Sequence, residues 1–224
     1  DEYKDTPFYN AILASLMFAM SYNSQSTGHY AQYRDATNES SMTDILIYRR
    51  KEILPFFIRK MEELKDILNG NQFSYEVYSL DYLDCLDLIP ENTVVYADPP
   101  YVFVHYSRFY HAIETLVKYD YPKVKYKGRY RTDRHQSPFC IRTQVEGAFR
   151  KMFEKIKLKN SNLVLSYSDT GMIKLEQLTE LARSVFGSKY ELQVQTIDYL
   201  HSTMGRREDK SRNVQEALIT AKIR

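Results

Sequence analysis

The sequence has few cysteines and no long apolar run, so it lacks the usual signs of a zinc site, a disulfide scaffold or a membrane span. Only two of its 224 residues are cysteines, Cys85 and Cys140, and their spacing suits neither a zinc site nor a disulfide framework. The longest apolar run, residues 11–20, is too short to cross a bilayer, and no basic-flanked signal peptide precedes it. We therefore expect a soluble intracellular protein with no metal and no membrane partner.

A strong net charge and tryptophan are missing as well. Because the net charge is only +2, the charge of the whole chain says nothing about a nucleic-acid partner, and only its distribution can. Tryptophan is absent while 20 residues are tyrosine, so any stacking on bases would fall to tyrosine and phenylalanine. The length fits one domain, or one domain with a subdomain.

The most informative segment is a short apolar strand, residues 93–97, that runs directly into Asp98-Pro99-Pro100-Tyr101. Two successive prolines fix φ at about −65° and remove two amide donors, so the chain leaves the sheet in a stiff turn that presents the Asp98 carboxylate and backbone carbonyls. Tyr101 adds a flat ring at the carboxyl end of a strand, where open α/β sheets bind ligands. This turn suits a planar amino group such as the N6 amine of adenine, although an ordinary strand-ending turn has the same local sequence.

Further segments extend this motif: residues 105–111, 119–122 and 163–171. Together with Asp98–Tyr101 they resemble the Dam-like class of DNA adenine-N6 methyltransferases, which use S-adenosylmethionine (AdoMet). The resemblance covers about residues 75–222, and residues 8–34 more loosely. It implies an α/β fold with a Rossmann-like class I methyltransferase sheet, partial here, and a helical and loop region for DNA recognition. It also implies a prokaryotic or phage-encoded enzyme of the cytoplasm, associated with the nucleoid, of the kind found in restriction-modification.

The resemblance assigns the catalytic role to Asp98, Pro99, Pro100 and Tyr101. The enzymes of this class transfer a methyl group from AdoMet to an adenine that is flipped out of double-stranded DNA. By analogy, the Asp98 carboxylate and the Pro99 carbonyl would orient the two N6 hydrogens, and Tyr101 would stack on the flipped base. No metal is needed. The strand over residues 163–168 is expected beside this turn, with Ser166, Tyr167 and Ser168 at the rim of the same pocket.

The expected AdoMet contacts are Asp81, Tyr82 and Asp98. Asp81 is an equally good N-cap for a helix over residues 82–88, and one residue can do both. The Gly-rich strand-to-helix turn that seats AdoMet in this superfamily is missing, because no two of the glycines are close together; they lie at positions 28, 70, 128, 147, 171, 187 and 205. We therefore expect a fragment or one half of a split enzyme, in which a partner chain or an N-terminal segment supplies the AdoMet loop.

The distribution of charge favours a DNA-binding segment. Residues 118–142 contain eight lysines or arginines against two acids, a local charge of +6, with tyrosines between them. A polar, basic loop at 201–212 joins two predicted strands and is a second candidate. The residues expected to contact DNA are Tyr106, Arg108, Tyr110, Lys123, Lys125, Lys127, Arg129, Arg131, Arg134, Arg206 and Arg207. The alternative for both segments is a solvated loop.

The pattern of apolar residues predicts a helical region over residues 1–70 and an α/β portion over 71–224 with a basic insertion at about 103–142. The resemblance implies that the helical region takes part in DNA recognition, that the α/β portion is catalytic and that the insertion contacts DNA. The predicted sheet is mostly parallel, with helices on its faces. Its strands are 74–79, 93–97, 162–167, 190–198 and 214–222, the last of them antiparallel to its neighbours. The predicted helices are 8–20, which looks largely buried, 42–68 with a kink or break at Pro55, 82–88, 144–158 and 175–186.

Two other functions remain open from the sequence. One is a nucleic-acid-binding module that keeps the fold but catalyses nothing; retention of all four residues Asp98–Tyr101 argues against it. The other is an amino-methyltransferase that acts on cytosine N4, RNA or a protein side-chain amide. An aspartate at the head of the motif argues against that, because the related cytosine-N4 enzymes more often carry serine there and the glutamine enzymes asparagine.

Overall fold

The computed structural model describes residues 6–24, 30, 35–70, 74–101, 103, 105–202 and 211–224. The chain divides into two compact units, which are described one at a time. Unit 1 comprises residues 1–75 and 106–135, and unit 2 comprises residues 76–105 and 136–224. The chain therefore passes between the two units three times, at residues 75/76, 105/106 and 135/136.

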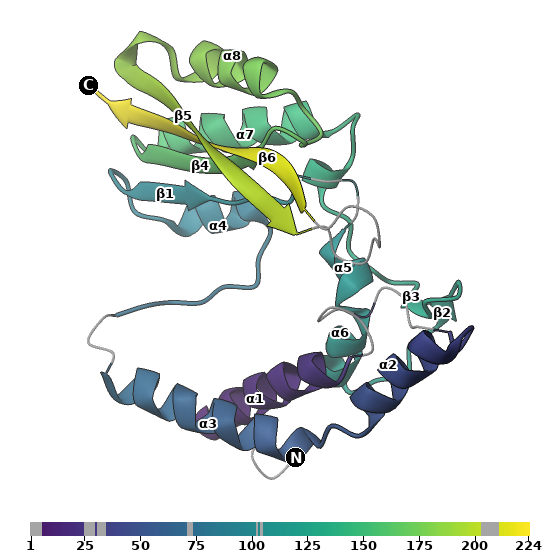
Figure 1. The fold of residues 1–224 in the computed structure, drawn as a ribbon. Helices are drawn as coiled ribbons and strands as arrows, with labels where there is room; N and C mark the ends of the chain where they lie inside the picture. Colours follow the sequence, from purple (N-terminus) through teal and green to yellow (C-terminus); the bar gives the residue numbers. More distant parts are fainter. Residues whose placement is uncertain are drawn as a thin grey trace. The chain divides into compact units, whose positions relative to one another are not determined.

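Unit 2 is built on a four-stranded mixed sheet with the strand order β1-β4-β6-β5 (Figure 1). Its strands are β1 (Val94–Ala97), β4 (Asn162–Ser168), β5 (Tyr190–Ser202) and β6 (Ser211–Ile223). β1 pairs with β4 in parallel, whereas β6 is antiparallel to both β4 and β5. These pairings confirm four of the predicted strands and the antiparallel direction of the last one. The expectation of a mostly parallel sheet is wrong for the described residues, because β6 forms a hairpin with β5 and lies between β5 and β4, so two of the three strand pairings are antiparallel.

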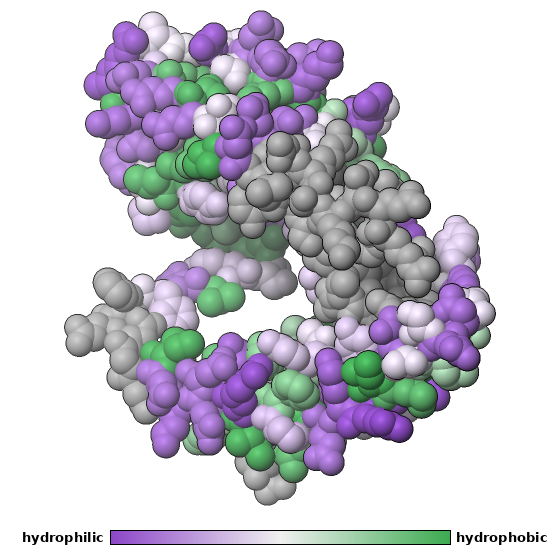
Figure 2. All heavy atoms as spheres, viewed as in Figure 1, coloured by the Kyte–Doolittle hydropathy of each residue, from purple (hydrophilic) through white to green (hydrophobic). Residues whose placement is uncertain are grey.

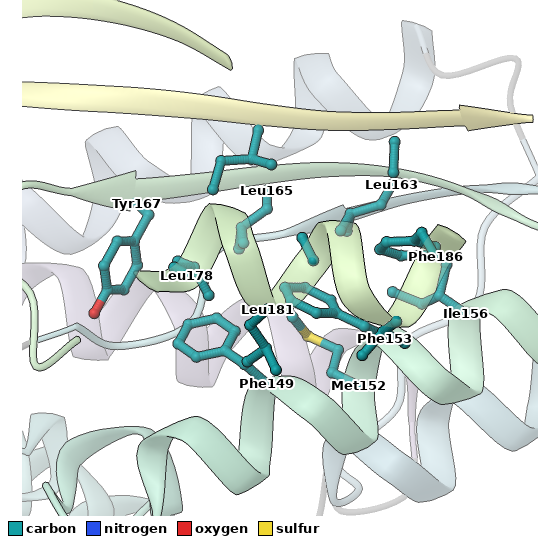
Figure 3. Close-up of a cluster of buried hydrophobic side chains, with 14 of the residues drawn as sticks. Phe149, Met152, Phe153, Ile156, Leu163, Leu165, Tyr167, Leu178, Leu181 and Phe186 are labelled. Carbon is teal, nitrogen blue, oxygen red and sulfur yellow. The ribbon is translucent and has the colours of Figure 1, made fainter. Parts of the chain in front are cut away.

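The helices α4 (Tyr82–Leu88), α7 (Val145–Leu158) and α8 (Leu175–Phe186) pack on one face of this sheet, and all three confirm predicted helices. Leu163, Leu165 and Tyr167 alternate along β4 and point toward α7 and α8 (Figure 3). Fully buried side chains from these helices and strands include Phe149, Phe153, Ile156, Leu163, Leu165, Leu178, Phe186 and Ile219. Because burial of one such side chain contributes about 1.5–3 kcal/mol, this cluster fixes the helices on the sheet.

The other face of the sheet is open in the described part of the chain. Val95 and Ala97 pack against the core, while the alternate residues of β1, Val94 and Tyr96, are 63% and 64% exposed. On β5, Ile197 is also exposed. Figure 2 shows hydrophobic residues at the surface near β1 and α4, below the mainly hydrophilic surface around α8. β1 is also an edge strand of the described sheet.

The predicted strand at 74–79 is wrong. Residues 74–79 have no regular secondary structure, and their side chains are exposed, including Tyr75 and Val77. A strand needs a neighbour to pair its backbone groups, and the alternating sequence here has none among the described residues. The segment instead connects unit 1 to unit 2.

Unit 1 contains the helices α1 (Pro7–Asn23), α2 (Glu39–Arg49) and α3 (Ile53–Gly70). α1 begins as predicted, with Thr6 as N-cap and Pro7 in its first turn, but only Ser15 and Ala19 of its described side chains are buried, so the expectation of a largely buried helix is wrong. α1 packs on α3 through the stacked rings of Tyr22 and Phe56, whose centroids are 4.8 Å apart.

The predicted helix over residues 42–68 is divided. The break lies at residues 50–52, and Pro55 falls in the first turn of α3, where its missing N–H needs no partner. No helix among the described residues is long and apolar enough to span a membrane.

The 106–135 segment of unit 1 contains short elements that the sequence did not predict. They are α5 (Tyr106–Phe109), α6 (His111–Lys118), β2 (Val124–Lys125) and β3 (Tyr130–Arg131), and the last two form an antiparallel hairpin. The chain returns to unit 2 at the 3₁₀ helix η1 (Pro138–Cys140), and a second one, η2 (Gly187–Lys189), follows α8. Ser137 N donates to His105 Nε2 (2.9 Å). This bond joins the residues of unit 2 that precede and follow the 106–135 segment.

Candidate functional site

The Asp98–Tyr101 turn lies at the carboxyl end of β1, as predicted. Ala97 is opposite Leu165 of β4, and β4 continues past this pair as far as Ser168. The turn therefore runs beside the last residues of β4. Asp98 is exposed, Pro99 is buried and Pro100 is half-buried.

The two prolines of the turn offer hydrogen-bond acceptors only. The two prolines have no N–H, and the Asp98 carboxylate has no hydrogen-bond or ion-pair partner among the residues that the structure describes. An exposed, unpaired carboxylate at the edge of a sheet is poised to accept hydrogens from a ligand. The geometry thus suits a donor such as an exocyclic amino group.

The loop that follows β4 fixes the position of Tyr101. Met172 N donates to the Tyr101 carbonyl (2.9 Å), and the Tyr101 ring meets the Tyr167 ring edge to face, with centroids 6.2 Å apart at 75°. Tyr101 is half-buried against the core. One backbone bond and one ring contact therefore hold the residue that ends the motif.

Tyr167 is the centre of this support. It is 1% exposed, it contacts Phe149 in the core (Figure 3), and its hydroxyl accepts a hydrogen bond from Ile173 N (3.1 Å). Burial raises the pKa of Tyr167, so the hydroxyl stays neutral. Gly171 crosses directly over this ring: a Cβ at that position would lie 2.3 Å from it. A glycine is needed there for the loop to pass.

The expected rim of Ser166, Tyr167 and Ser168 needs correction. Tyr167 and Ser168 are buried, at 1% and 2% exposure, and only Ser166 is half-buried. Because successive side chains of a strand point to opposite faces, Tyr167 enters the core side of the sheet with Leu163 and Leu165. The contribution of Tyr167 to the site is support of the turn.

Asp81 and Tyr82 have structural partners. Asp81 Oδ1 accepts from Leu83 N (2.9 Å), which confirms Asp81 as the N-cap of α4. The Tyr82 hydroxyl donates to the Ala148 carbonyl (3.3 Å), and its ring packs edge-on against Phe139, 5.0 Å away. The AdoMet contacts expected of these two residues remain predictions, and the structure shows that Tyr82 also packs on the core.

Arg131 is buried, which corrects its expected role as a phosphate contact. It is 3% exposed, and all five of its N–H donors are used. Its Nη1 and Nη2 bind both oxygens of Asp120 (2.5 and 2.7 Å), Nε and Nη2 bind Asp133 (3.0 and 2.8 Å), and Nη1 also binds Thr115 Oγ1 (3.2 Å). The bonds to Asp120 and Asp133 raise the pKa of Arg131 and lower those of both aspartates. Arg131 ties the end of α6 to the β2–β3 hairpin.

Arg108 and Arg134 both lie against the ring of Tyr130. Their guanidinium carbons are 5.3 and 5.2 Å from its centroid, and Arg108 Nε donates to the Tyr130 hydroxyl (3.2 Å). Tyr130 is 7% exposed, so these arginines cover a core ring of unit 1. Both are partly exposed, and contact with DNA remains a prediction for them.

The other predicted DNA contacts in this segment are at the surface. Lys123, Lys125 and Arg129 are exposed, and Lys127 is exposed and forms an ion pair with Asp35. Tyr106 and Tyr110 are exposed rings 6.1 Å apart that line a pocket of about 340 Å³ in unit 1, together with Lys118 and Arg134. Arg206 and Arg207 lie outside the described residues.

Comparison with known proteins identifies the family. The model of the D12 class of N6 adenine-specific DNA methyltransferases matches residues 2–181. The chain belongs to this family. The match includes Asp98–Tyr101 and the whole 106–135 segment, and it confirms the class that the motif suggested.

Two modification methylases and a type II methyltransferase are similar to this D12-class chain. Modification methylase LlaI of Lactococcus lactis subsp. lactis is 30% identical over 106 residues, 47% of this chain and 17% of its own length. Type II methyltransferase M.FokI of Planomicrobium okeanokoites is 27% identical over 118 residues, 52% of this chain and 18% of its own. Modification methylase StsI of Streptococcus sanguinis is 23% identical over 177 residues, which are 78% of this chain and 24% of its own length. This chain thus spans less than a quarter of the length of each relative. No solved structure matches it.

Proposed function

We propose that this chain is the catalytic portion of a site-specific DNA adenine-N6 methyltransferase. The observation that carries the proposal is the turn Asp98–Tyr101: an exposed acceptor at the carboxyl end of β1, held by the loop after β4, in a chain of the D12 class. The three similar proteins are described as modification methylases or a type II methyltransferase, which supports a role in restriction-modification. A DNA substrate implies a cytoplasmic enzyme in a bacterial or phage-infected cell.

The residues of the turn orient the amino group of a flipped adenine. The Asp98 carboxylate and the Pro99 carbonyl each accept one of the two N6 hydrogens, which directs the nitrogen lone pair out of the ring system. Tyr101 stacks on the base, and this stacking offsets part of the few kcal/mol that unpairing the base costs. AdoMet supplies an electrophilic methyl group to the reaction. Catalysis by the chain itself is therefore orientation and placement of charge.

The described residues do not form a complete seat for AdoMet. Asp81 has one carboxylate oxygen beyond its capping bond, the Tyr82 hydroxyl is bonded to Ala148, and the sequence has no Gly-rich strand-to-helix turn. We propose that this seat comes from strands that add to the edge strand β1, either from another segment of the same protein or from a partner chain. The completed sheet would be Rossmann-like, with α4, α7 and α8 on one face and further helices on the open face.

The change Asp98→Asn tests this proposal. Asparagine keeps the shape of the side chain but replaces one acceptor by a donor aimed at the N6 amine, so the rate should fall by about 100-fold or more while DNA affinity stays within about twofold. The assay is transfer of tritium from labelled AdoMet to adenine by this chain together with its AdoMet-binding half. Asp84→Asn, the same change at an exposed position of α4, is the matched control and should keep full activity. Full activity of Asp98→Asn would remove the residue from catalysis, and DNA binding without any tritium transfer by the unaltered protein would favour a non-catalytic DNA-binding module.

A further inference from the structure

The loop that follows β4 holds a threonine beside the turn Asp98–Tyr101. Ser168 is the last residue of β4, and Met172 N donates to the Tyr101 carbonyl (2.9 Å). Thr170 lies midway between them, in a short loop that continues β4 at one end and is bonded to the turn at the other. The Thr170 side chain is exposed, whereas Ser168 is 2% exposed. A hydroxyl group therefore reaches the surface at the edge of the sheet where the turn lies.

The hydrogen-bond distances assign the hydroxyl protons of this loop. Ser168 Oγ accepts a hydrogen bond from Thr170 N (3.3 Å). Because Ser168 is buried, its own O–H needs an acceptor, and two oxygens are near: Thr170 Oγ1 at 2.9 Å and Asp169 Oδ1 at 3.5 Å. An O–H···O bond spans about 2.5–3.0 Å, so Ser168 donates to Thr170 Oγ1. The Thr170 O–H is then left without an acceptor among the described residues and can donate to a ligand.

A hydroxyl donor complements the acceptors of the turn. The Asp98 carboxylate and the Pro99 carbonyl suit the two N6 hydrogens of adenine. The Watson–Crick edge, by which enzymes read a flipped base, also carries an acceptor, the ring nitrogen N1 next to N6. An acceptor that is buried without a partner weakens binding. A pocket that takes adenine by this edge therefore gains from one donor beside its acceptors.

We propose that the Thr170 O–H donates to N1 of the flipped adenine and that Ser168 orients this hydroxyl by donating to its oxygen. The contact selects bases that carry an amino group beside a bare ring nitrogen. Guanine and thymine would instead place a carbonyl oxygen against the Asp98 carboxylate and an N–H against the Thr170 O–H. Cytosine shares the pattern of adenine, so this contact does not exclude it. The inference rests on the proposed function, because N1 is read only if the site takes an adenine, and it names a residue that determines specificity there.

The test combines variants of Thr170 with analogues of adenine. The methylated site is first mapped on unmodified DNA by single-molecule sequencing. Duplexes with this site then carry adenine, 1-deazaadenine or 7-deazaadenine at the target position, so that C–H replaces N1 or N7. The enzyme is this chain together with its AdoMet-binding half, either unaltered or with Thr170→Val, which removes the hydroxyl at nearly constant shape, or Thr170→Ser, which keeps it. Thr196→Val, the same change at an exposed position of β5, is the matched control.

Single-turnover rates of tritium transfer give the result. We expect Thr170→Val to slow methylation of adenine by about 5- to 20-fold, while Thr170→Ser and Thr196→Val stay within about twofold of the unaltered enzyme. The unaltered enzyme should be slower with 1-deazaadenine than with 7-deazaadenine by a similar factor. Thr170→Val should treat the two analogues alike, because it has already lost the same bond. Each comparison of analogues is made within one enzyme, so a loss of stability in the variant cancels.

Two outcomes would overturn the inference and leave the proposed function standing. One is an equal penalty for 1-deazaadenine in the unaltered enzyme and in Thr170→Val, which would show that the hydroxyl does not contact N1. The other is a penalty for 7-deazaadenine that Thr170→Val abolishes, which would place the contact on the opposite side of N6. If the unaltered enzyme methylates no adenine, the proposed function fails, and the inference fails with it.

Discussion

The change Tyr167→Phe should weaken the support of the catalytic turn without opening a cavity. Phenylalanine keeps the buried ring and removes only the hydroxyl that accepts a hydrogen bond from Ile173 N (3.1 Å). Ile173 is 6% exposed, so water is a poor substitute for the lost acceptor. A buried donor without a partner costs about 1–3 kcal/mol, and we expect the free energy of unfolding to fall by that amount.

The activity should fall more than the stability explains. Met172, the neighbour of Ile173, donates to the Tyr101 carbonyl (2.9 Å), so a shift of this loop moves Tyr101 and, through the stiff Pro99-Pro100 segment, the Asp98 end of the same turn. A displacement of about 1 Å at a catalytic group can cost about 100-fold in rate. We therefore expect methyl transfer by Tyr167→Phe to drop by about 10- to 100-fold, with DNA affinity nearly unchanged.

Tyr190→Phe provides the matched control. Tyr190 is 3% exposed, and its hydroxyl donates to the Ser161 carbonyl (3.2 Å) at the opposite end of β4 from Tyr167. Its loss should lower stability by a similar amount, as urea denaturation would measure, and leave the rate of tritium transfer intact. If both variants lost activity in proportion to stability, general destabilisation would explain the effect, and the argument that Tyr167 positions Tyr101 would be refuted.

Three further predictions concern separate features of the molecule. Gly171→Ala should destabilise unit 2 by about 1–3 kcal/mol because its Cβ would lie 2.3 Å from the Tyr167 ring, whereas Gly147→Ala on α7, with nothing within 4 Å, should be neutral or stabilising in thermal denaturation. Replacing Lys123, Lys125 and Lys127 together by glutamine should lower the salt slope of DNA binding by about 2–3 units, and an unchanged slope would show a merely solvated segment. Unit 1 should lose stability in acid: hydrogen bonds from Arg131 lower the pKa of Asp120 and Asp133, so their stabilisation is complete above the ordinary value of 3.8 and is lost as the pH falls through the lower folded-state pKa. Circular dichroism should show this loss in the unaltered protein and not in Arg131→Met.

The elements that the sequence predicts correctly are those with a repeating burial pattern. α7 and α8 each place an apolar residue on the core at every turn, and β4 alternates Leu163, Leu165 and Tyr167, so periodicity alone locates them. The segment 74–79 has the same alternation but no neighbour to pair with, which no local pattern reveals. The β2–β3 hairpin pairs only two residues in each strand and is too short for any period.

The residues of the candidate site also fall into two groups: those that local sequence predicts and those that depend on tertiary contacts. The position of Asp98 follows from a strand that ends in two prolines, which is local information. The roles of Tyr167, Gly171 and Arg131 depend on contacts between segments distant in sequence or packed across a loop. A count of charges over residues 118–142 treats Arg131 like its neighbours, although Arg131 is buried and its charge is paired with Asp120 and Asp133.

The composition of β1 suits a strand that is covered on both faces. Val94, Val95, Tyr96 and Ala97 are all apolar, and a strand without alternation is typical of parallel sheets that are covered on both faces. In the described structure only Val95 and Ala97 are covered, while Val94 and Tyr96 are 63% and 64% exposed on an edge strand. Isolated exposed side chains are ordinary, but an edge strand with an apolar open face is a hazard for aggregation that proteins normally avoid. The composition of β1 therefore supports the proposal that a second layer, with the seat for AdoMet, packs on this face and pairs with this edge.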